Sequence, residues 1–94
     1  MNVRVSRRAA EDLAAATNYL AERNPRAAAA LVEEVMTLSE RLAQRAFEGP
    51  EHRLRSGLLV RSWPLPPYRL YYRRRGDALE ILRVYHQARR PITK

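Results

Sequence analysis

The sequence contains no cysteine, only three glycines and only two histidines among its 94 residues. Without cysteine the chain cannot form a disulfide framework, a thiolate metal site or a cysteine nucleophile, a composition typical of a reducing compartment. Three glycines are too few for a phosphate-binding loop, and His52 and His86 lack metal-ligand spacing to a third residue. Ser56 and Ser62 have no neighbouring base that the sequence identifies. We therefore expect no metal, no cofactor and no serine-triad chemistry.

Long apolar runs are also missing. No segment approaches the roughly 20 residues that a membrane-spanning helix needs, and the N-terminal residues lack the apolar stretch of a signal peptide. A chain of 94 residues with 46% hydrophobic residues can form one small core. The sequence predicts a single cytoplasmic domain over residues 1–94.

Basic residues are present in excess and unevenly placed. Lysine and arginine total 18 against 10 acidic residues, which gives a formal charge of +8. Residues 1–46 hold seven arginines and six acidic residues, whereas residues 47–94 hold ten arginines and one lysine against four acidic residues. A solubility device or a codon bias toward arginine explains the excess but not its position. The distribution favours a basic surface in the second half that binds an anionic partner.

The first half has the spacing of a strand and two helices. Alternation over residues 2–6 predicts a short strand, and Ser6 is placed to cap the helix that follows. Asn24 and Pro25 separate this helix from a second one, because Asn caps well and Pro is tolerated at the first helical position. The second helix is expected to end near Ala46. The short connection makes the two helices an antiparallel hairpin.

The second half is predicted to form strands. Residues 58–63 lead into a proline-rich turn at 64–67, and residues 68–73 alternate in polarity. Residues 79–85 are apolar on both faces, which is typical of a central strand. The predicted fold is α+β: an N-terminal strand, an antiparallel helix hairpin and a curled three-stranded antiparallel sheet.

Two sets of residues in this half are functional candidates. Cleaving RNA without a metal requires a base, an acid and a cation for the phosphate. His86 with Tyr85 beside it provides an acid or base, Glu51 or His52 a base, and Arg69 the cation, although each also has an ordinary structural explanation.

The other set combines arginines with aromatic anchors, which serve nucleic-acid surfaces and protein hot spots alike. This set comprises Arg53, Arg55, Arg61, Trp63, Tyr71, Arg73, Arg83, Arg89 and Arg90.

The order of elements, the segment Tyr-Arg-Leu-Tyr-Tyr at 68–72 and the closing segment 79–91 together resemble the ParE/RelE toxin superfamily of type II toxin–antitoxin systems. The resemblance covers essentially the whole chain. It implies a growth-inhibiting toxin neutralised by a cognate antitoxin, which in this superfamily wraps the toxin with a helix and an extended segment. We expect that partner to be acidic and amphipathic, because it would cover the basic half.

The superfamily has two activities. The ParE-like branch implies poisoning of DNA gyrase with no bond made or broken by the toxin, and the ending 83–91 looks more like this branch. The RelE/YoeB-like branch implies ribosome-dependent cleavage of mRNA, and would make the chain an enzyme.

The residues also allow the second branch in part. Glu51, Arg69 and His86 fall where YoeB-type enzymes keep a base carboxylate, a phosphate arginine and a terminal histidine, but Gln87 stands where a tyrosine is expected. We expect a ParE-like toxin, with the endonuclease as the alternative and a non-toxic RNA- or protein-binding module as a further one.

Overall fold

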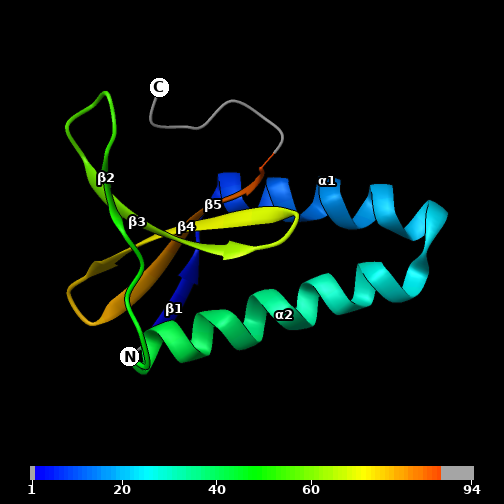
Figure 1. Cartoon of the computed structure of the whole chain (residues 1–94), viewed down its shortest axis with the longest axis horizontal. Coiled ribbons are helices and arrows are strands. Elements are labelled where there is room, and N and C mark those ends of the chain that lie inside the picture. The colour runs from blue at the N-terminus through cyan, green and yellow to red at the C-terminus, as the bar shows by residue number, and fades with distance from the viewer. Residues whose placement is uncertain (1, 88–94) are drawn as a thin grey trace.

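The computed structural model describes residues 2–87, which form a five-stranded sheet with a pair of helices against one face (Figure 1). The elements along the chain are β1 (Asn2–Val5), α1 (Arg7–Arg23), α2 (Pro25–Ala43), β2 (Glu51–Arg53), β3 (Leu59–Leu65), β4 (Tyr68–Arg75) and β5 (Ala78–His86). The α+β class and the helix hairpin are confirmed.

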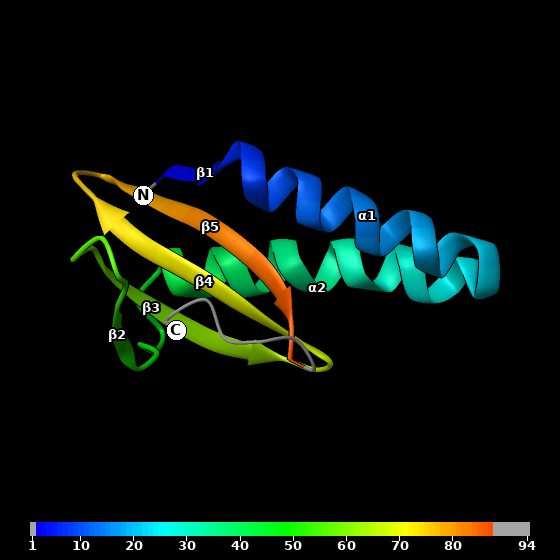
Figure 2. The same ribbon diagram turned by 90° about the horizontal axis from the view of Figure 1, so that it is seen from above.

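The helices begin where the capping residues predict. Ser6 Oγ accepts a hydrogen bond from the Ala9 amide at 3.1 Å, and Asn24 Oδ1 accepts one from the Ala27 amide at 3.2 Å. The turn at Asn24 projects past the sheet, as both ribbon views show (Figure 2). The second helix ends at Ala43 instead of near Ala46, and Arg45 then adopts a positive φ of 59°.

The sheet has five strands, and the prediction of three in it was wrong. The strand order is β1-β5-β4-β3-β2, with β1 parallel to β5 and the other pairs antiparallel. The predicted N-terminal strand, β1, joins the same sheet. The strand β2 was not predicted, because three residues are too few to show the alternation of polar and apolar residues that indicates a strand. The strand β5 lies between β1 and β4, in the central position that its two apolar faces indicate.

A proline lies within β3, although the sequence placed it in a turn. The Ser62 amide donates to the Pro50 carbonyl at 3.2 Å, so the amide positions of Ser62 and, two residues on, Pro64 face away from β4. At Pro64 the three-residue β2 has already ended, so the missing N–H costs no ladder hydrogen bond. The turn itself is at Pro66 and Pro67, which are joined by a cis peptide bond.

The core lies between the helices and one face of the sheet. Its fully packed members are Ala9, Leu31, Val35, Leu38 and Leu42 from the helices and Leu70, Tyr72, Leu79, Ile81 and Val84 from the sheet. Direct cross-strand partners share a face, so the partners Trp63 and Leu70 both face the helices. We call the opposite face, which carries Ser62, Arg69, Tyr71 and Tyr85, the outer face.

Candidate interaction surface

The alternation of β4 brings several predicted site residues onto the outer face. Arg69 and Tyr71 point away from the core, which holds Leu70 and Tyr72. Tyr85 is the cross-strand partner of Arg69, and Arg83 is that of Tyr71. Two candidate catalytic residues and two candidate binding residues are therefore neighbours.

A hydrogen-bonded cluster at Ser62 anchors this group. Arg69 Nη1 donates to Ser62 Oγ at 2.8 Å, and Ser62 Oγ lies 2.7 Å from His52 Nε2. A guanidinium can only donate, so the serine hydroxyl accepts from Arg69, and its remaining donor and acceptor capacity serves the hydrogen bond with His52.

The cluster corrects the sequence analysis, because Ser62 does have a base beside it. The two residues are ten positions apart, on β2 and β3, and only the pairing of a strand that was not predicted brings them together. Ser62 is 0% exposed, whereas Arg69 and His52 are half-buried. Predicting residues 51–61 as a hairpin in this register would have placed His52 near Ser62.

Tyr71 is a buried aromatic residue of the outer face. It is 5% exposed, and the His52 ring centroid lies 5.9 Å from its own. Burial raises the pKa of the Tyr71 phenol, Arg69 opposes the rise and Tyr85 adds to it. The phenol therefore stays protonated at neutral pH and can act as a hydrogen-bond donor.

Arg83 connects the sheet to α1. Its Nε and Nη2 donate to Asp12 Oδ2 and Oδ1 at 2.7 and 3.0 Å, and the Val84 amide donates to Asp12 Oδ2 at 3.1 Å. The hydrogen bonds from Asp12 are the main reason that the pKa of Arg83 is raised. The guanidinium also lies 5.0 Å from the Tyr85 ring centroid. Two of its N–H donors and its charge are thus used within the fold.

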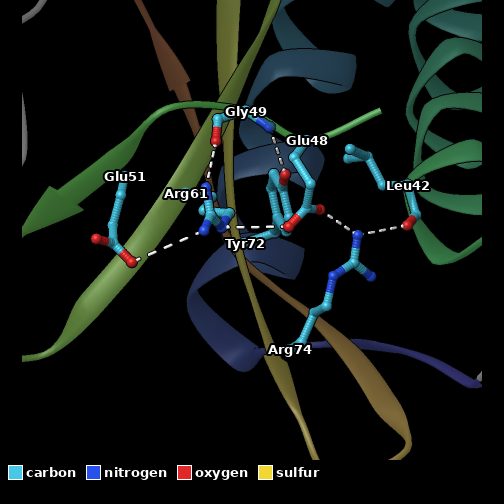
Figure 3. A network of polar contacts seen from close by, with 7 residues as sticks. All are labelled: Leu42, Glu48, Gly49, Glu51, Arg61, Tyr72 and Arg74. Atoms are coloured by element: carbon cyan, nitrogen blue, oxygen red, sulfur yellow. Dashed lines mark hydrogen bonds and ion pairs between the residues drawn. The ribbon is translucent and has the colours of Figure 1, made fainter. Parts of the chain in front are cut away.

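Arg61 lies in a second polar network, on the helix-facing side of the sheet (Figure 3). Its Nη1 donates to the Gly49 carbonyl at 2.8 Å, and its guanidinium lies 3.3 Å from a Glu48 oxygen and 3.8 Å from a Glu51 oxygen. Glu51, predicted as a catalytic base, is therefore a partner of Arg61.

The same network fixes the segment between α2 and β2. Arg74 donates to the Leu42 carbonyl at 2.8 Å and to Glu48, and the Gly49 amide donates to Tyr72 Oη at 2.9 Å (Figure 3). The hydrogen bond from Arg74 is the main cause that lowers the pKa of Glu48. These contacts attach the end of α2 to the sheet.

His86 lies apart from Arg69. It is the cross-strand partner of Tyr68, with the two rings edge-on at 5.3 Å, and faces α1. There it lines a groove of about 540 Å³ together with Glu11 and Tyr19. Of the four predicted catalytic residues, the structure brings together Arg69 and Tyr85, and it leaves Glu51 and His86 on the other side of the sheet.

The remaining predicted binding residues are spread over both faces. Arg53 and Arg55 are exposed near the β2–β3 turn, and Arg73 pairs with Glu80 at 2.6 Å. Trp63 packs on the helix-facing side, 4.3 Å from the Phe47 ring centroid. The predictions for Arg89 and Arg90 lie outside the described residues.

Residues 2–87 lack two kinds of feature. No helix there is long and apolar enough to cross a membrane. Nor does that range hold a group of three or more histidine, cysteine, aspartate or glutamate residues arranged to bind a metal ion.

Comparison with known proteins gives a family match and structural matches. The family model described as "ParE toxin of type II toxin-antitoxin system, parDE" matches residues 3–91. Among solved structures, a chain from the "Chromosomal ParDE TA system from P. aeruginosa" has a TM-score of 0.73 at 23% identity, with 92% of this chain and 95% of that chain covered. No curated protein matches. The structural match shows the fold, and the family match over nearly the whole length shows that this chain belongs to the ParE toxin family of type II toxin–antitoxin systems.

Proposed function

We propose that this ParE toxin arrests bacterial growth by poisoning DNA gyrase through protein–protein contact, and that a cognate antitoxin neutralises it. The observation that carries the proposal is the family match over residues 3–91, since gyrase poisoning is what the resemblance to the ParE-like branch implies. DNA gyrase acts in the cytoplasm, so the toxin is expected to act there.

The arrangement of the candidate catalytic residues supports this choice. A general acid and a phosphate cation must reach the same phosphodiester. Arg69 is on the outer face, whereas His86 faces α1 and Glu51 contacts Arg61. A toxin that acts by binding needs no such convergence.

The alternative is a RelE/YoeB-like mRNA endonuclease. One observation favours it: Arg69 and Tyr85 are cross-strand partners on the outer face, so a phosphate group could contact both. It would need an acid or base other than His86 on that face, and His52, held by Ser62, is the nearest candidate.

Induced expression of the chain in bacteria tests the proposal. We expect growth arrest with double-strand DNA breaks and an SOS response, and we expect His86→Ala to arrest growth as the wild type does. Arrest with cleaved mRNA and intact DNA would favour the endonuclease. Unimpaired growth with soluble, folded protein would favour a non-toxic binding module.

A further inference from the structure

Half-buried arginines in this fold are almost always matched by a carboxylate. Five arginines within residues 2–87 are half-buried, and four of them have an acidic partner. The pairs are Arg61 with Glu48 and Glu51, Arg73 with Glu80, Arg74 with Glu48, and Arg83 with Asp12. Pairing of this kind offsets the cost of removing a charge from water.

Arg69 is the exception among these five. Within the described residues, its side chain forms one hydrogen bond, from Nη1 to Ser62 Oγ, and no ion pair. Ser62 is neutral and fully buried, and its hydroxyl also hydrogen-bonds His52. The half-buried charge of Arg69 therefore has no counter-ion in the part of the chain that the structure describes.

The free edge of this guanidinium has the geometry that binds a carboxylate elsewhere in the same molecule. Arg83 holds Asp12 through Nε and Nη2, which form a fork that matches two carboxylate oxygens. Arg69 uses Nη1 for Ser62, so its own Nε–Nη2 edge is left for a ligand. Because Ser62 fixes the guanidinium in advance, little side-chain entropy remains to be lost on binding.

The surroundings add donors. Tyr71 lies close enough to Arg69 for the guanidinium charge to affect the pKa of its phenol, which is protonated at neutral pH and can donate a hydrogen bond. Glu80, the acidic residue of β5, is already bound to Arg73 at 2.6 Å and cannot neutralise Arg69. On the other flank, the cross-strand partner Pro64 is exposed, so this side of Arg69 borders solvent.

We propose that Arg69 is the anchor of a carboxylate-binding site on the outer face, and that its ligand is a glutamate or aspartate side chain of the antitoxin. This inference rests on the proposed function, because it assigns a site to the antitoxin. Ser62 acts as a positioning residue that orients the fork.

A protein carboxylate fits this site better than a nucleic acid. Affinity for a phosphate backbone depends on several unpaired cations in a row. Here Arg73 and Arg83, the arginines nearest along the sheet, are neutralised by Glu80 and Asp12. A single guanidinium without a counter-ion matches a single carboxylate. The exposed Arg53 and Arg55 would attract an acidic segment to this surface by long-range electrostatics.

Titration of the full chain with two probes tests this. The probes are a short amphipathic peptide of leucine and glutamate and a short oligouridylate, and the Arg69 Nε–Hε NMR signal reports contact. We expect the peptide to shift this signal and Arg69→Gln to weaken peptide binding about tenfold or more. Arg55→Gln, which removes an exposed charge, should weaken it by about twofold or less. Ser62→Ala should reduce affinity while leaving the Arg69 charge in place.

The contrary results are equally specific. Equal losses for Arg69→Gln and Arg55→Gln, or a shift of the Arg69 signal by oligouridylate and not by the peptide, would overturn the proposal. If Arg69→Gln melts well below the wild type, Arg69→Lys is used in its place. Lysine keeps the positive charge but lacks the two-pronged guanidinium edge, so this variant should still bind the peptide more weakly than the wild type. Gyrase inhibition by the wild type, measured separately, tests the proposed function, so the two can fail independently.

Discussion

Arg83 of β5 and Asp12 of α1, 71 positions apart in the sequence, form a two-pronged ion pair at 2.7 and 3.0 Å that joins the first helix to the sheet. The Asp12 carboxylate also accepts a hydrogen bond from the Val84 amide, so this one side chain makes three hydrogen bonds to β5. The side chains of Arg83 and Asp12 are 19% and 13% exposed.

Replacing Asp12 by alanine should therefore destabilise the protein strongly. It leaves a half-buried guanidinium without its carboxylate and removes three hydrogen bonds, which we expect to lower the free energy of unfolding by about 2–4 kcal/mol. Urea denaturation measures this. The neighbouring Glu11→Ala, at an exposed position, should cost about 0.5 kcal/mol or less. Similar losses for the two variants would show that the Arg83–Asp12 ion pair does not stabilise the fold.

Gly49 should tolerate no side chain. A Cβ placed there would lie 1.8 Å from the Ser62 carbonyl oxygen, which is backbone and cannot move aside alone. We expect Gly49→Ala to cost about 3 kcal/mol or more, or to prevent soluble expression. At Gly57 a Cβ meets nothing within 4 Å, so Gly57→Ala should cost only about 1 kcal/mol from its positive φ of 89°. Thermal melting of both variants compares them directly.

Acid should weaken the network around Glu48. Its pKa is lowered below the ordinary 4.5, chiefly by the hydrogen bond from Arg74. A carboxyl whose folded-state pKa is depressed stabilises the fold above the unfolded-state pKa, and this stabilisation is lost as the pH falls through the folded-state value. Between about pH 5 and pH 3, unfolding free energy should therefore fall less steeply in Glu48→Gln than in the wild type. Parallel slopes in urea titrations across this range would show that Glu48 is not coupled to folding.

Tyr72 should be needed for its hydroxyl as well as for its ring. Its Oη accepts a hydrogen bond from the buried Gly49 amide at 2.9 Å, and Tyr72→Phe would leave that amide without this acceptor. We expect a loss of about 1–3 kcal/mol. Tyr19→Phe, at an exposed phenol, serves as the matched control, and its midpoint should stay near that of the wild type.

Local signals were sufficient for the helices and the long strands. Ser6 and Asn24 bind the amides that their capping role predicts, and Leu31, Val35, Leu38 and Leu42 are buried as their spacing indicates. These features depend on neighbours within one or two helical turns, which a single sequence displays.

Features that depend on distant pairing could not be read in this way. The strand β2 has only three residues, and its register alone brings His52 to Ser62. Similarly, Arg61, Arg73 and Arg83 appear in the sequence as unpaired charges, whereas the fold supplies a carboxylate to each. The basic excess of the second half therefore overstates the number of arginines available to a partner, and Arg69 could be recognised only after the others were paired.

The most direct measurement adds the purified chain to DNA gyrase, relaxed plasmid and ATP. The account predicts loss of supercoiling with accumulation of cleaved plasmid that is released as linear DNA after protein denaturation, and the same result for His86→Ala. Normal supercoiling by gyrase, together with cleavage of mRNA on ribosomes by the same preparation and its loss in His86→Ala, would contradict the account.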